Sequence, residues 1–171
     1  RIPLPSTMLT GFFLYSIAAA LSATVDSEIH MCFSFAILSR LGHCCLLRPK
    51  EIMKLVVGDL RLPRAAFEPN ILVLRLRDPK NRSSLGRFQF AMCKDTALID
   101  WVRWYVAEMP PDMPLWPSSQ ARFGKMFRVV RDRLEWERIA LTPGCLRPGG
   151  ATEAFMRGLS VAQLKYMGRW R

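Results

Sequence analysis

Residues 71–92 read ILVLRLRDPKNRSSLGRFQFAM, and this stretch decides the fold class because it interrupts a chain whose other patterns are helical. Residues 71–77 alternate, with three leucines on one face and Val73, Arg75 and Arg77 on the other. Residues 78–86 have the composition of a turn, and residues 87–92 alternate again, which places Phe88 and Phe90 on the same face. The stretch predicts a β-hairpin, with residues 59–62 as a third strand.

Helical patterns lie on both sides of the hairpin. The expected helices cover residues 8–23, 28–41 (ended by Gly42), 49–56, 95–108, 119–137, 151–157 and 160–167, and residues 142–150 are expected to form a loop. We therefore predict a mainly α fold with a small antiparallel β-sheet insert, in one unit over residues 1–171. Its parts are a helical part (1–57), the hairpin insert (58–94) and a second helical part (95–171).

Composition and charge restrict the class of protein. The chain has 171 residues, of which 50% are hydrophobic and 11% aromatic, so a disordered, collagen-like or low-complexity chain is excluded. The formal net charge is +11, and 19 of the 25 basic residues are arginine. All of this excess lies in residues 48–171. Because the planar guanidinium group fits phosphate oxygens, this composition favours a phosphate or nucleic-acid partner.

The five cysteines predict neither a disulfide framework nor a metal site. They are odd in number, form no CxxC pair, and have only two histidines to accompany them. A reducing, intracellular location is therefore expected, with no metal and no cofactor.

The apolar segment Met8–Ala23 allows two interpretations. It could be a buried first helix, capped by Ser6 or Thr7, or the hydrophobic part of a signal peptide in a secreted or membrane-surface protein. A secreted protein with five unpaired cysteines would be unusual, so we favour the core helix and expect no membrane partner.

Two arginines stand in the same local context. Arg48 and Arg147 each lie between a leucine and a proline, just before an expected helix start. Helix N-termini attract anions, so the two arginines could converge on one phosphate. The alternative is that each meets only solvent or a carboxylate.

Two further basic regions are candidates for phosphate contact. Lys80 is expected at the hairpin tip, among Arg75, Arg77, Arg82 and Arg87, where it either contacts DNA or is simply solvated. Near the C-terminal end, Arg169 and Trp170 could donate hydrogen bonds to a phosphate. Alternatively, Trp170 is a core anchor and Arg169 a surface residue.

Together these segments resemble the boxes of the tyrosine recombinases, the phage-integrase family. Residues 47–60 (LRPKEIMKLVVGDL) resemble the first arginine box, with Leu46 where the family usually has glycine. The hairpin with Lys80 is similar to the family's β-turn lysine. Residues 141–152 (LTPGCLRPGGAT) resemble the second arginine box, and residues 158–169 the Gly-x-Ser … Leu-Gly-His stretch. Details such as Gly-Arg-Trp are similar to recombinase-like genes of eukaryotic mobile elements.

The resemblance implies a recombinase catalytic-domain fold and metal-free strand cleavage and rejoining of double-stranded DNA, through a phosphotyrosyl intermediate and without ATP. Arg48 and Arg147 would hold the non-bridging phosphate oxygens, and Lys80 would protonate the leaving 5′-oxygen. Arg169 or Trp170 would fill the family's His/Trp position; counting from Gly168 favours Arg169 and residue type favours Trp170. The implied partners are DNA and further copies of the chain. The implied location is with the genomic DNA, which in a eukaryote is the nucleus.

The chain also departs from the family pattern at the two histidines and at the nucleophile. Gly144 and Pro148 occupy the two histidine positions around the second arginine. The family's nucleophilic tyrosine lies roughly ten residues after the Gly-His step, beyond Arg171, and none of Tyr15, Tyr105 and Tyr166 matches it. We therefore expect a C-terminally truncated fragment of a recombinase or integrase that binds DNA without cleaving it. The alternative is a non-catalytic nucleic-acid-binding module derived from a mobile element.

Overall fold

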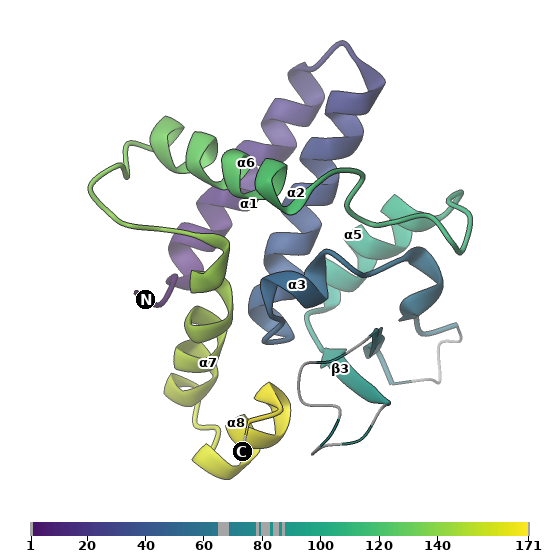
Figure 1. The fold of residues 1–171 in the computed structure, drawn as a ribbon, viewed down its shortest axis with the longest axis vertical. Helices are drawn as coiled ribbons and strands as arrows, with labels where there is room; N and C mark the ends of the chain where they lie inside the picture. The colour runs from purple at the N-terminus through teal and green to yellow at the C-terminus, as the bar shows by residue number, and fades with distance from the viewer. Residues whose placement is uncertain are drawn as a thin grey trace.

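A small sheet lies at one edge of a group of helices in the computed structural model, which describes residues 2–64, 69–77, 79, 83, 86 and 88–170 (Figure 1). The α-helices are α1 (Ser6–Ser22), α2 (Asp26–Cys44), α3 (Pro49–Ile52), α5 (Thr96–Val106), α6 (Gln120–Arg133), α7 (Leu146–Met156) and α8 (Val161–Gly168). The strands are β1 (Leu60–Arg61), β2 (Leu72–Leu76) and β3 (Gln89–Cys93), and the 3-10 turns are η1 (Val57–Asp59) and η2 (Pro143–Cys145).

The predicted sheet is confirmed. Its order is β1-β2-β3 and both pairings are antiparallel, with Leu74 opposite Leu60 on one side and Ala91 on the other. The side chains of Leu72, Leu74 and Leu76 are buried, as the alternation predicts. The predicted fold class, mainly helical with a small antiparallel sheet, is therefore confirmed.

Aromatic side chains join the two helical parts in one core. Phe12 of α1 packs against Phe127 of α6, with ring centroids 4.6 Å apart, and Phe35 of α2 packs against Phe123 of α6 at 4.9 Å. The expected first helix is thus a core helix, because Phe12 is fully buried. Within the described ranges, no helix has both the length and the apolar character that crossing a membrane requires.

Side-chain caps fix where two of the later helices begin. The Asp95 carboxylate accepts a hydrogen bond from the backbone N–H of Leu98 at 3.0 Å, and the Ser119 hydroxyl accepts one from that of Arg122 at 3.2 Å. These caps confirm the predicted starts of α5 and α6. The latter ends at Arg133, before the predicted residue 137, because Glu135 adopts a left-handed conformation with φ 59°.

Two element boundaries predicted near the arginine boxes are wrong. α2 continues past Gly42 to Cys44, and α3 ends at Ile52, after which Val56 forms a β-bridge with Pro114. If α3 continued to residue 56, as predicted, Val56 could not form this bridge.

The predicted loop over residues 142–150 is also wrong. These residues form η2 and the first turn of α7. The glycines there serve close packing: a Cβ at Gly149 would lie 2.2 Å from the Leu4 carbonyl oxygen, and one at Gly150 would lie 2.0 Å from that of His43. Glycine therefore lets the backbone of α7 touch both the N-terminal segment and α2, which brings Arg147 close to the end of α2.

We predict that Gly150→Ala lowers the free energy of unfolding by about 3 kcal/mol, because the added methyl group forces the α7 and α2 backbones apart. Gly124→Ala is the matched control, since its Cβ would meet no atom within 4 Å in the interior of α6. This control should raise the free energy of unfolding by about 0.5–1 kcal/mol. Urea denaturation measures both, and equal effects of the two variants would contradict the packing role.

Candidate anion-binding site

Arg48 is positioned by the way α2 ends. Leu46 adopts a left-handed conformation with φ 51°, and the Leu47 N–H donates to the Gly42 carbonyl at 2.9 Å, as in a Schellman cap. The chain therefore turns sharply, and Arg48 becomes the residue that precedes α3. A left-handed conformation is one that glycine adopts more easily than leucine.

Glu51 of α3 binds Arg48 twice. Its Oε2 accepts the backbone N–H of Arg48 at 2.8 Å, and its Oε1 accepts a hydrogen bond from Arg48 Nη1 at 2.8 Å. The side chain of Glu51 is 5% exposed, so this is a buried carboxylate. Burial of such a group is tolerated because its oxygens are hydrogen-bonded by cations.

Arg169 reaches the same carboxylate from the end of α8. Like Leu46, it is a left-handed residue at a helix end, with φ 55°. Its Nη2 donates to Glu51 Oε2 at 3.0 Å and to the Leu46 carbonyl oxygen at 3.2 Å. The two left-handed turns thus contact one another, and Glu51 joins Arg48 to Arg169.

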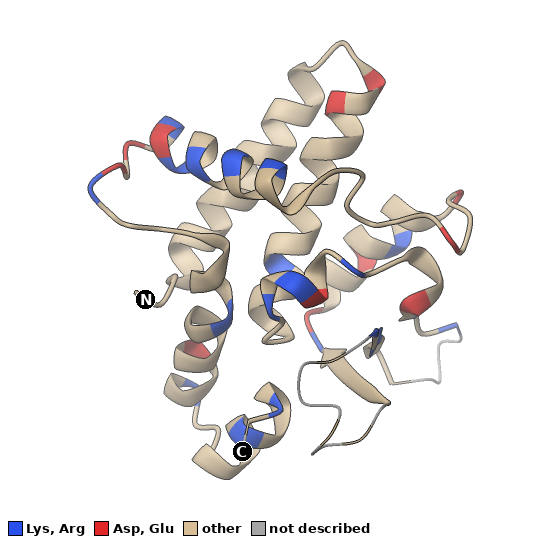
Figure 2. Cartoon of the chain, viewed as in Figure 1, with Lys and Arg blue, Asp and Glu red and all other residues tan. Residues whose placement is uncertain are grey.

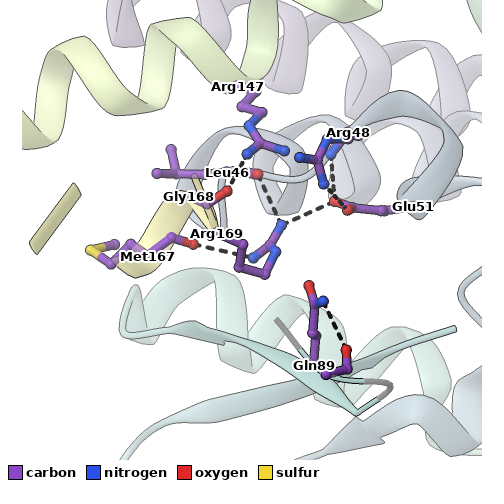
Figure 3. A network of polar contacts seen from close by, with 9 residues as sticks. Leu46, Arg48, Glu51, Gln89, Arg147, Met167, Gly168 and Arg169 are labelled. Atoms are coloured by element: carbon purple, nitrogen blue, oxygen red, sulfur yellow. Dashed lines mark hydrogen bonds and ion pairs between the residues drawn. The ribbon is translucent and has the colours of Figure 1, made fainter. Parts of the chain in front are cut away.

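Arg147 is the third cation of this group and is only 8% exposed. Its Nη2 donates to the Gly168 carbonyl oxygen, and its guanidinium carbon lies 5.2 Å from the centroid of the Trp170 ring. Its Nη1 is buried and has no hydrogen-bond partner among the described residues. Figure 3 shows the guanidinium groups of Arg147 and Arg48 next to each other.

The charges in this group do not balance. Arg48 and Arg169 bind Glu51 and Arg147 lies within their electrostatic reach, so these four side chains carry an excess of two positive charges. Burial, together with the positive charges of Arg48 and Arg169, lowers the pKa of Arg147 to about 10, against the opposing effect of Glu51. Burial also lowers the pKa of Arg169. We call Arg48, Arg147, Arg169 and Glu51 the arginine cluster; an anion bound there would relieve both the repulsion and the unpaired Nη1.

The structure brings together Arg48, Arg147, Arg169 and Trp170, while their catalytic roles stay predictions. Arg48 does bind a carboxylate, as the alternative interpretation of this residue predicts. However, the same carboxylate also binds Arg169, so Arg48 is part of a larger group. The interpretation of Arg169 as a surface residue is wrong, because its side chain is buried. Trp170 is half-buried against Arg147 rather than being a core anchor.

The hairpin residues are placed differently. Lys80, Arg82 and Arg87 lie outside the described residues. Arg75 and Arg77 both bind the buried carboxylate of Asp59, with Nε–Oδ distances of 2.9 and 2.7 Å. Their side chains remain about half exposed, so part of each is available to a partner.

Two polar residues of this region were not singled out from the sequence as site residues. Glu51 was interpreted only through the helix dipole and the recombinase pattern. Gln89 of β3 is buried; its Nε2 donates to the Gly86 carbonyl at 3.1 Å, and its Oε1 has no partner among the described residues. Figure 3 shows this oxygen pointing toward Arg169. The signal was a polar residue at an inward position of a strand that otherwise buries Ala91 and Cys93.

Among the described residues, no three His, Cys, Asp or Glu side chains are grouped so that they could hold a metal ion.

Of the comparisons with known proteins, the one with solved structures finds proteins similar to this chain. No protein-family model matches the chain, and no curated protein matches it significantly. Among solved structures, the chain is similar to XerH site-specific recombinase bound to its difH substrate in a pre-cleavage complex, with a TM-score of 0.69 and 13% identity. It is also similar to XerA recombinase, with a TM-score of 0.64 and 14% identity.

Both matches cover 98% of this chain, but only 46% of the XerH chain and 54% of the XerA chain. The chain therefore spans about half the length of these two proteins. At this level of identity the likeness shows a shared fold, and it confirms the predicted fold of the tyrosine-recombinase catalytic-domain type.

We predict that Glu51→Gln lowers the free energy of unfolding by about 3 kcal/mol, because Arg48 and Arg169 lose the buried carboxylate with which both form ion pairs. Sulfate should restore more stability to this variant than to the unchanged chain, since it replaces the missing negative charge. Urea denaturation with and without sulfate measures this.

Asp59→Asn is the matched control, because it also removes a buried carboxylate that holds two arginines. The side chains of those arginines are half exposed, so sulfate should restore less stability to Asp59→Asn than to Glu51→Gln. Equal restoration in both variants would show that the arginine cluster has no particular affinity for an anion.

Proposed function

We propose that the chain is a recombinase-like DNA-binding domain that seats one phosphodiester of double-stranded DNA in the arginine cluster. The observation that carries this proposal is the convergence of Arg48, Arg147 and Arg169, from three distant parts of the chain, around one carboxylate. The excess positive charge and the unpaired Arg147 Nη1 match what a phosphate supplies, namely negative charge and several acceptor oxygens.

A second basic surface supports binding to an extended polyanion. The solvent side of α6 carries Arg122, Lys125, Arg128 and Arg133, whose side chains have no ion-pair partner among the described residues. The opposite side of α6 carries the buried Phe123, Phe127 and Val130. Figure 2 shows these basic positions along α6, in front of α1 and α2, and others around α3, α7 and α8. A long duplex offers phosphates to both surfaces.

The chemistry that we propose is metal-free DNA strand cleavage and rejoining, as in integration or recombination. It would be carried out by a longer protein that contains these 171 residues, which we call the parent protein. Arg48 and Arg147 would bind the non-bridging oxygens and stabilise the charge that develops in the transition state. Arg169 or Trp170 would contact the same phosphate, and Lys80 would donate a proton to the leaving oxygen. Glu51 would hold Arg48 and Arg169 in place without touching the DNA.

We assign the nucleophile to none of the three tyrosines of the chain. The Tyr105 hydroxyl is within hydrogen-bond distance of the His30 ring, at 3.1 Å, and Tyr15 packs against the helical core. Tyr166 lies on the exposed side of α8, and its sequence position does not match. We therefore expect these 171 residues to bind DNA, together with further copies of the chain on genomic DNA, without cleaving it.

A second candidate function is a non-catalytic nucleic-acid-binding module derived from a mobile element. It is favoured by Gly144 and Pro148, which lie in η2 and in the first turn of α7 and cannot donate the hydrogen bonds that two histidines would supply. This candidate keeps the phosphate contact and gives up the chemistry.

We predict that binding to a short duplex weakens steeply as salt rises from about 50 to 300 mM, because bound cations release counterions from the DNA. Arg48→Ala and Arg147→Ala should each weaken binding about tenfold, and the double variant should lose less than the product, because both contact one phosphate. Fluorescence anisotropy measures these affinities, and circular dichroism checks that each variant is folded.

Arg103→Ala is the control, because it removes an arginine on α5 that is paired with Asp100. If the double variant loses no more affinity than this control, the cluster is not the DNA site. A nicked duplex that traps covalent complexes separates the two candidates: a protein–DNA adduct with the parent protein supports the recombinase, and a folded parent that binds without an adduct supports the module.

A further inference from the structure

The outer face of the sheet carries exposed apolar side chains. Alternate residues of the β3 segment, Phe88, Phe90 and Met92, are 77%, 55% and 45% exposed. The residues between them, Gln89 and Ala91, are buried on the face that packs toward the helices. Two adjacent aromatic rings in solvent on one strand are unusual for a surface with no partner.

Basic side chains share this outer face. The register pairs Phe90 with Arg75 and Met92 with Val73, and Arg77 is the residue that follows β2. Asp59, which directly precedes β1, binds the Nε groups of both arginines at distances below 3 Å and so fixes their guanidinium groups on the β1 side of β2. The terminal nitrogens of Arg77 have no partner among the described residues.

We propose that this face binds single-stranded nucleic acid, with bases stacked on Phe88 and Phe90 and the backbone held by Arg75 and Arg77. Every unpaired base presents a flat ring that stacks on an aromatic side chain, whereas the bases of a duplex are already stacked on each other. The charge also selects the occupant, because one carboxylate, Asp59, pairs with two arginines, and the remaining positive charge attracts a polyanion. A hydrophobic protein partner would cover the half-exposed arginine side chains without supplying a negative charge.

This binding face is separate from the arginine cluster. Gln89 points to the cluster, so its neighbours Phe88 and Phe90 point away from it, on the opposite face of the sheet. The inference therefore does not rest on the proposed duplex site, and the two can fail independently.

The test is fluorescence anisotropy of a labelled oligothymidine of about 15 nucleotides, titrated with the 171-residue chain. The variant Phe88→Ala/Phe90→Ala should weaken binding to this strand about tenfold or more, while binding to a duplex changes less than about twofold. Both rings are exposed, so the variant should fold, and circular dichroism confirms it. Arg48→Ala should show the reverse pattern, with duplex binding weakened and strand binding kept.

Phe155→Ala is the matched control, because Phe155 is 57% exposed on α7, far from any strand of the sheet in sequence. A second readout reports stacking directly: Phe90→Trp should add a tryptophan emission that the oligothymidine quenches. If the double variant binds the strand as well as the Phe155→Ala control does, the proposal is overturned. It is equally overturned if the double variant abolishes self-association of the chain in sedimentation while strand affinity stays unchanged.

Discussion

The arrangement of the candidate site depends on one buried carboxylate. Glu51 accepts hydrogen bonds from the backbone and side chain of Arg48 and from the side chain of Arg169, which lies 118 residues further along the chain. Two physical requirements at Glu51 oppose each other. A buried carboxylate requires cations, but the arginine cluster has three guanidinium groups and one carboxylate, so its four side chains keep an excess of positive charge. The contacts to Glu51 hold the cluster together, and the excess charge is what the proposed phosphate would neutralise.

The backbone around this carboxylate is strained at two positions. Leu46 and Arg169 both adopt left-handed conformations, which cost about 1–2 kcal/mol for residues that carry a Cβ. Each ends a helix, and the Leu46 carbonyl accepts a hydrogen bond from Arg169. Strain of this kind persists where surrounding contacts impose it, and such positions gather at functional sites. The buried side chain of Leu46 and the ion pair of Arg169 supply these contacts.

The sequence contained the local patterns of this fold but little of its tertiary packing. Alternation identified β2 and β3, and capping residues such as Asp95 and Ser119 identified helix starts, because these signals act within a few residues. The first turn of α7 was predicted as a loop, since Pro148, Gly149 and Gly150 are read locally as helix breakers. Only the contact with Leu4 and His43 shows that the glycines serve close packing. Likewise, the shared Leu-Arg-Pro context indicated Arg48 and Arg147. That Arg48 and Arg169 both bind Glu51 is a contact between distant parts of the chain, which no local pattern contains.

The proposed DNA site requires that the three guanidinium groups act as one receptor for one phosphate group. Nitrogen-detected NMR of the arginine side chains, titrated with inorganic phosphate, tests this directly. The Nε signals of Arg48, Arg147 and Arg169 should shift together along a single binding curve, while those of the surface arginine Arg103 stay in place. Signals that do not move, or that move with different midpoints, would show that the three groups do not form one receptor.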